Sequence, residues 1–188
     1  VYIILFMPFL TFMQCSLFTQ KHQVQPAVRV MSFNIRYNNP NDGPHAWPNR
    51  KDVVAQLIRF HGADVIGVQE ALHEQMLDLE QRLPEYGWLG IGRDDGKILG
   101  EYSAILYRKA RFKLLDQSTF WLSETPDSAG RRGWDAACVR IVTWGKFKDK
   151  KSGSDFVLLN THFDHLGEVA RLESAKLLHR HIQQLPAN

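Results

Sequence analysis

Apolar residues follow two different spacings along the chain, and these spacings alternate in its first half. Short, nearly continuous apolar runs predict β-strands at residues 28–33 and 65–68. Apolar residues three and four positions apart predict amphipathic helices at residues 49–60 and 71–83, the first closed by His61-Gly62. Residues 37–48 are dense in Asn, Pro, Gly and Asp and are predicted to form a loop.

Strand patterns dominate the second half of the chain. The strands are predicted at residues 88–92, 103–107, 112–122, 138–147 and 156–161. Helical spacing returns only at residues 168–185, which predicts a closing amphipathic helix. Since no repeat or interior linker interrupts this order, the pattern indicates one α/β domain of mixed sheet and flanking helices.

Composition narrows the class of protein. The chain has 188 residues, of which 44% are hydrophobic and 23% charged, so disordered and fibrous proteins are excluded. Two cysteines cannot build a disulfide scaffold or a structural zinc finger. A net charge of +3 gives no strong electrostatic footprint for nucleic acid, although a local basic patch can still bind phosphate.

The first residues differ from the rest of the chain. Residues 1–20 contain no Lys, Arg, Asp or Glu, and residues 1–13 are almost entirely apolar. This pattern is typical of a signal peptide. An uncleaved membrane anchor is the alternative. A buried core helix is a third interpretation, but Pro8 in the middle of the segment argues against it. We therefore expect a leader or anchor with a spacer at 1–23 and a domain at 24–188. We also expect export to the periplasm, the extracellular space or a membrane surface, with any membrane contact made through residues 1–23 alone.

Three predicted strands end in polar residues, namely Asn34, Glu70 and His162. Each has a purely structural explanation: a turn for Asn34, a helix N-terminus for Glu70, and a backbone hydrogen bond for His162. Ligands of open α/β sheets collect at the carboxyl ends of strands. Together, a carboxylate, a carboxamide and an imidazole there suit a hard cation and a phosphate group.

Four short segments carry a family resemblance. They are Met31-Ser-Phe-Asn-Ile-Arg36, Val65-Ile-Gly-Val-Gln-Glu70, Glu101-Tyr-Ser-Ala-Ile-Leu-Tyr107 and Asn160-Thr-His-Phe-Asp164. In order and spacing they resemble the endonuclease/exonuclease/phosphatase superfamily, over roughly residues 28–182. Residues 120–126 and 134–137 look like those of an exported bacterial branch of that superfamily.

The resemblance implies a fold and a chemistry. The fold is a four-layer α/β sandwich of two mixed β-sheets flanked by helices. Glu70, supported by Asn34, would hold Mg²⁺ or Mn²⁺, and His162 would contact the scissile phosphate. The substrate would be a phosphodiester or phosphomonoester, drawn from nucleic acids, phospholipid headgroups or sugar phosphates. We expect neither sequence-specific nucleic-acid binding nor an obligate protein partner.

Five further residues are weaker candidates for substrate contact. Glu101 and Tyr102 precede a predicted strand, Arg140 lies on another, and Asp164 and His165 follow His162 in the sequence. A surface salt bridge is an alternative role for Arg140.

The family pattern also includes a Gly-Asp-x-Asn motif and a terminal Asp-His pair, and neither occurs in this sequence. We therefore expect an N-terminal fragment with an incomplete second sheet, inactive and poorly soluble alone.

Two other classes remain open. The segment from Asn160 to Gly167 differs at its first position from the motif of metallo-β-lactamase-like zinc hydrolases, in which His162, Asp164 and His165 would bind zinc. That reading leaves Asn34 and Glu70 without a role. A non-catalytic exported binding domain is the second alternative, since five tryptophans could serve glycan or protein binding.

Overall fold

The computed structural model describes residues 27–185 and contains seven strands, three α-helices and one 3₁₀ helix in that range. The first half holds β1 (Val30–Asn34), the 3₁₀ helix η1 (Pro40–His45), α1 (Trp47–His61), β2 (Val65–Gln69), α2 (His73–Arg82) and β3 (Tyr86–Leu89). The second half holds β4 (Ile105–Arg108), β5 (Phe112–Trp121), β6 (Ile141–Asp149), β7 (Asp155–Thr161) and α3 (Glu168–Gln184).

The strands form two sheets. The first has the order β1-β2-β4-β3, with β1 and β2 parallel and the other neighbours antiparallel. The second has the order β5-β6-β7 and is antiparallel throughout, so within residues 27–185 only the first sheet is mixed.

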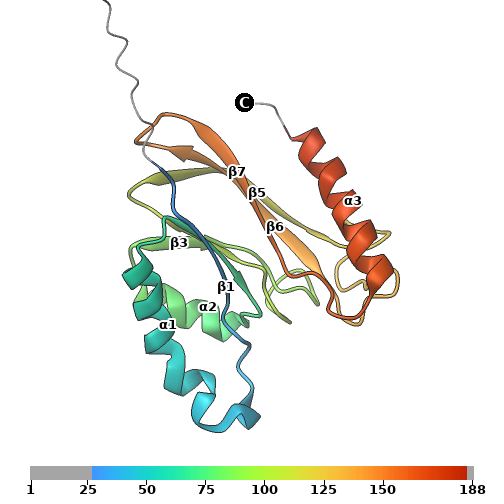
Figure 1. Ribbon diagram of the computed structural model, residues 1–188, viewed down its shortest axis with the longest axis horizontal. Helices are drawn as coiled ribbons and strands as arrows, with labels where there is room; N and C mark the ends of the chain where they lie inside the picture. The colour runs from blue at the N-terminus through green and yellow to red at the C-terminus, as the bar shows by residue number, and fades with distance from the viewer. Residues whose placement is uncertain (1–26, 186–188) are drawn as a thin grey trace, which may run out of the picture.

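The sheets face each other, and helices cover both outer faces (Figure 1). Three apolar clusters correspond to the three interfaces. The cluster that includes Ile58, Ile66 and Leu79 packs α1 and α2 on the first sheet. A second cluster, around Ile105 and Phe147, lies between the sheets. The third packs α3 on the second sheet. The four-layer α/β sandwich is confirmed.

Burial explains the residue pattern of β2. All five of its residues are buried, as the continuous apolar run predicts for a strand covered on both faces. Helix α1 ends at Gly62, which adopts the left-handed conformation with φ 58° that glycine favours at a helix terminus.

Some boundaries differ from those predicted. Strand β3 begins at Tyr86 and ends at Leu89, whereas a strand at 88–92 was predicted. Among the described residues it pairs with β4 alone, and β4 is four residues long. Strand β6 begins at Ile141 rather than at residue 138. The predicted loop 37–48 contains η1 and the start of α1.

The predicted leader or anchor at 1–23 lies outside the described residues. Between residues 27 and 185, no helix is long and apolar enough to cross a membrane.

Candidate functional site

The three polar strand ends lie at the same end of the two facing sheets. Asn34 is the last residue of β1, Glu70 follows β2, and His162 follows β7. Arg140 precedes β6, whose first residues pair with the end of β7. A cavity of about 320 Å³ opens between these ends, and it is lined by Arg36, Tyr37, Glu70, Arg93, Glu101, Cys138, Arg140, His162 and His165.

Glu70 is held in a fixed orientation at this cavity. Its backbone has φ 64°, a left-handed conformation that a residue with a side chain rarely adopts. The Nδ2 of Asn34 donates to Glu70 Oε1 at 2.8 Å, and the backbone N–H of Tyr37 donates to Oε2 at 3.3 Å. Each carboxylate oxygen keeps a free lone pair, so Glu70 remains able to bind a cation. Asn34 thus reaches the site through Glu70.

The loop after β1 is held by two residues that sequence analysis missed. Gln75 is fully buried; its Nε2 donates to Arg36 O at 3.0 Å, and its Oε1 accepts from Asn38 N at 2.9 Å. Arg50 donates to the carbonyls of Ile35 and Arg36. A glutamine on the apolar face of α2 was the available signal for Gln75.

His162 lies half-buried in the cavity wall. Burial, and next the positive charge of Arg140, lower its pKa below 6.5, so the imidazole is neutral at neutral pH. Its Nδ1 is buried and has no hydrogen-bond partner among the described residues. Because a buried polar atom of this kind is costly, the site is suited to a ligand that completes it.

Glu101 places a second carboxylate in the cavity. Arg93 Nη1 donates to Glu101 Oε2 at 2.7 Å. Burial raises the pKa of Glu101, and the negative charge of Glu70 adds to the effect despite the opposing influence of Arg93. The cavity therefore contains two carboxylates that repel each other, together with three guanidinium groups.

Two of the weaker candidates lie beneath the cavity and do not line it. Tyr102 is 2% exposed, and its hydroxyl bonds His73 Nδ1 at 3.0 Å and Lys97 O at 3.1 Å. Asp164 is 4% exposed and accepts hydrogen bonds from five groups. Burial alone would raise the pKa of Asp164, but the backbone N–H donors outweigh it and hold the pKa far below its ordinary value. Both side chains are thus placed to support the rim of the cavity, and their predicted contact with substrate stays a prediction.

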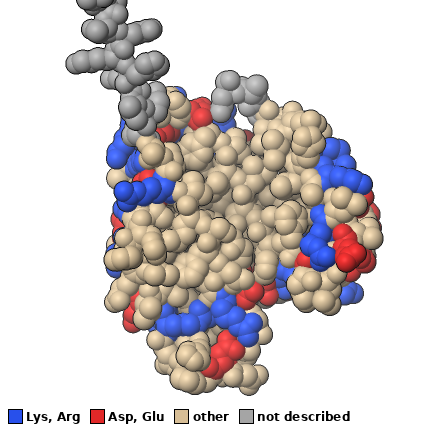
Figure 2. Space-filling view, in the orientation of Figure 1, with Lys and Arg blue, Asp and Glu red and all other residues tan. Residues whose placement is uncertain are grey.

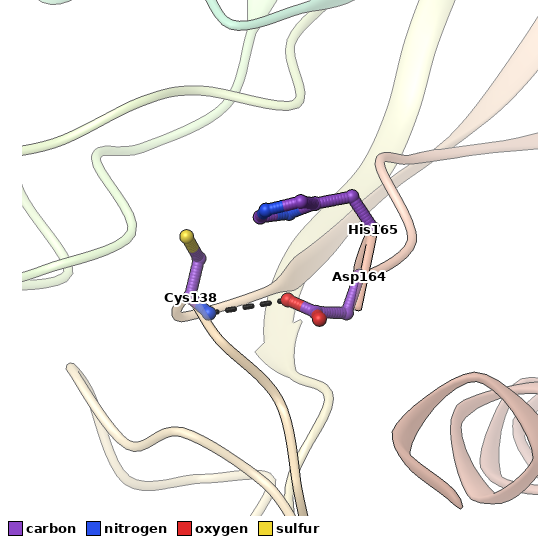
Figure 3. Close-up of side chains that lie close together, drawn as sticks. All are labelled: Cys138, Asp164 and His165. Carbon is purple, nitrogen blue, oxygen red and sulfur yellow. Dashed lines mark hydrogen bonds between the residues drawn. The ribbon is translucent and has the colours of Figure 1, made fainter. Parts of the chain in front are cut away.

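Cys138, Asp164 and His165 bring one potential ligand atom each within 4.8 Å of one another. Figure 3 shows the Cys138 sulfur and the His165 ring on the same side, with the Asp164 carboxylate turned to the Cys138 backbone. Asp164 is occupied by its five donors. Arg140 Nη2 lies 3.1 Å from His165 Nδ1, and a guanidinium can only donate, so Nε2 is the ring nitrogen left for a metal. With Asp164 committed to its donors, the cluster offers two ligands, whereas zinc takes three or four from a protein. The chemistry of this cluster does not fit a zinc site.

Asn160 links the two sheets behind the cavity. It is 6% exposed, and its Nδ2 donates to Val68 O and Ala104 O, both at 2.8 Å. Its Oδ1 accepts from Gln69 Nε2 at 2.7 Å. Gly67 leaves room for this amide, since a Cβ there would lie 2.6 Å from Asn160 Oδ1. The link fixes the distance between Glu70, on one sheet, and His162, on the other.

At one end, this four-layer sandwich gathers a carboxylate, an imidazole and several guanidinium groups, which suit a metal cation and a phosphate group. The chain belongs to the Endonuclease/Exonuclease/phosphatase family, whose model matches residues 31–188. This membership confirms the sequence resemblance and excludes the zinc-hydrolase alternative as a fold.

Solved structures and curated proteins agree with this family. The endonuclease/exonuclease/phosphatase from Bacteroides vulgatus is 55% identical, with a TM-score of 0.83, over 84% of this chain and 60% of that chain. The mannosyl-6-phosphatase Bt3783 of Bacteroides thetaiotaomicron is 43% identical, with a TM-score of 0.82, over 85% and 60%. The CCR4-Not 3'-5'-exoribonuclease subunit Ccr4 of Aspergillus clavatus is 23% identical, over 77% of this chain and 22% of that protein. The chain thus spans about 60% of the length of the two solved relatives.

Proposed function

We propose that this chain forms part of a phosphoesterase that uses a divalent metal ion, with its site in the cavity between Glu70 and His162. The observation that carries the proposal is the oriented Glu70 carboxylate, which shares a cavity with His162, Arg36, Arg93 and Arg140. Metal-assisted hydrolysis of a phosphate ester requires a carboxylate that holds the cation and positively charged groups that hold the anion.

Glu70 would hold Mg²⁺ or Mn²⁺, with Asn34 and the Tyr37 N–H fixing its orientation. The donor set fits, because Mg²⁺ takes one or two carboxylates from the protein and fills its other positions with water and phosphate oxygens. A bound metal ion would polarise a phosphoryl oxygen and stabilise the charge that develops on the leaving oxygen.

His162 and Arg140 would hold the phosphate. Neutral His162 has one donor and one acceptor nitrogen, so it can donate a hydrogen bond to a phosphoryl oxygen without repelling the nearby guanidinium groups. Arg140 is anchored from behind, since its Nε donates to Asp164 Oδ2 at 3.2 Å and its Nη2 contacts His165. An anchored guanidinium loses little conformational freedom when an anion binds.

A phosphomonoester of a sugar is the substrate class we propose first. The support is the 43% identity to a mannosyl-6-phosphatase, against 23% to an exoribonuclease subunit. A cavity of about 320 Å³ also lies at the small end of the range for ligand pockets, which suits a compact substrate.

Two measurements test the proposal. The first is Mn²⁺ binding to this chain, by electron paramagnetic resonance, with Glu70→Gln and, as the matched control, the exposed Glu80→Gln. Only Glu70→Gln should abolish binding, and equal binding by both variants would reject the metal site.

The second measurement is turnover by a fusion of this chain to the remaining part of the Bacteroides vulgatus relative. Hexose 6-phosphates, a dinucleotide phosphodiester and phospholipid headgroup esters are offered with Mg²⁺ and with chelator. We expect chelator-sensitive release of phosphate from the sugar phosphates. Hydrolysis of none of them by a folded fusion would favour the non-catalytic binding domain.

A further inference from the structure

A second basic pocket lies at the other end of the sandwich. Its volume is about 470 Å³, and it is lined by Ala27, Arg29, Gly62, Asp64, Arg108, Arg111 and Lys151. These residues come from the segment before β1, the turn from α1 to β2, the turn from β4 to β5, and the hairpin between β6 and β7.

The strand directions separate this pocket from the cavity at Glu70. Strand β1 runs from the pocket to the cavity, and β6 runs the opposite way, from Ile141 at the cavity to Asp149 at the pocket. A nine-residue strand such as β6 spans about 30 Å at roughly 3.4 Å per residue. The two regions therefore lie at opposite ends of the sandwich.

The pocket has an excess of positive charge. Four basic residues line it, and Asp64 is the only acidic residue in its lining among residues 27–185. Arg111, which is 6% exposed, bonds Asp64 Oδ2 at 2.7 Å and Asp149 Oδ2 at 2.9 Å. One buried guanidinium thus engages both nearby carboxylates, and Arg108 Nε lies 3.9 Å from the second oxygen of Asp64. Four basic residues against these two carboxylates leave an excess of two positive charges, which Arg29 and Lys151 carry.

Arg29 and Lys151 are anchored through their backbones and keep their charged groups available, whereas Arg108 is held through its guanidinium. The backbone N–H of Arg29 donates to Asp64 at 2.9 Å, and that of Lys151 donates to Asp149 at 2.9 Å. Arg108 Nε donates to Ala63 O at 3.1 Å, and its guanidinium lies 5.0 Å from the Tyr86 ring. Within residues 27–185, neither the Arg29 guanidinium nor the Lys151 ammonium has a hydrogen-bond or ion-pair partner.

We propose that this pocket binds a phosphate group through Arg29, Arg108 and Lys151. Guanidinium groups match two phosphate oxygens at once, and an ammonium adds a compact positive charge. Figure 2 shows basic side chains at the corner of the molecule where the described chain begins. The phosphate belongs either to a soluble compound or to a lipid headgroup, and the uncharged residues 1–20 that precede this corner in the sequence favour the lipid.

Calorimetry on the full chain, without metal ions, tests the site with pyrophosphate as the probe. The test variant is Arg29→Gln/Lys151→Gln. The matched control is Lys176→Gln/Arg180→Gln, which removes the same charge from exposed positions on α3. Because the cavity at Glu70 is unchanged in both variants, the difference between their pyrophosphate affinities reports binding in the second basic pocket. We expect the pocket's affinity for pyrophosphate to fall by about tenfold or more in the test variant alone, since two charge-assisted contacts are lost.

Sedimentation with vesicles of phosphatidylglycerol or of phosphatidylcholine distinguishes a lipid headgroup from a soluble phosphate compound as the ligand. If the test variant alone loses a preference for phosphatidylglycerol, the ligand is a lipid headgroup. If it loses pyrophosphate binding while its vesicle preference matches the control, the ligand is a soluble phosphate. Equal pyrophosphate binding by the test and control variants would overturn the proposal.

Discussion

Replacing Asn160 by alanine should weaken the link between the two sheets. The substitution removes three hydrogen bonds, to Val68 O, Ala104 O and Gln69 Nε2, in a position that is 6% exposed. Ala104 O and Gln69 Nε2 each keep another contact, to Val68 N and Gly67 O respectively. We therefore count about 1 kcal/mol for each lost bond rather than a full desolvation penalty, which gives about 3 kcal/mol in total.

Thermal unfolding measures this effect directly. For a chain of this size, 1 kcal/mol corresponds to about 2–4 °C, so the melting temperature should fall by roughly 6–12 °C. The control is Asn41→Ala, because Asn41 is exposed and the side-chain change is identical. If Asn160→Ala melts at the same temperature as Asn41→Ala, the two sheets are not held together by this amide and the reasoning is refuted.

Three further substitutions test other parts of the structure. Gly67→Ala would place a Cβ 2.6 Å from Asn160 Oδ1, so we expect a loss of about 2 kcal/mol in chemical denaturation. Burial lowers the pKa of His181 below 6.5, so the unfolded chain binds more protons and stability falls as the pH drops below about 6.5. His181→Leu should reduce this slope in urea titrations between about pH 7.5 and about pH 5.5, and an unchanged slope would count against it. Arg140→Lys keeps the charge but loses the fork that contacts His165, so phosphate affinity in the cavity should fall by about tenfold, whereas an equal affinity would show that charge alone matters.

The positions of Asn34, Glu70 and His162 follow from a simple sequence rule. Each comes at the end of an apolar run, and a run long enough to form a buried strand must end near the surface. The rule places the three residues at strand ends, and the structure brings those ends to one cavity edge. It gives no information on how each side chain is oriented.

The supporting residues could not be assigned in the same way. The partners of Asn160 are backbone carbonyls on another sheet, and carbonyl groups have no sequence signature. The start of β6 was misplaced for a related reason. Residues 138–140 look like a strand, but Cys138 N–H and Arg140 donate to Asp164 rather than to a neighbouring strand. Long-range polar contacts of this kind override local propensity.

The division of the cavity between two sheets has a consequence for how the protein would fail on heating. Glu70 is carried by one sheet and His162 by the other, so a small slip at the interface between the sheets misaligns them while each sheet keeps its own ladder of hydrogen bonds. Proteins open in cooperative units before they unfold globally, and packed sheets are natural units of this kind. The proposed phosphate site would therefore be lost at a lower temperature than the β-structure, and circular dichroism would still report a folded chain after the site had come apart.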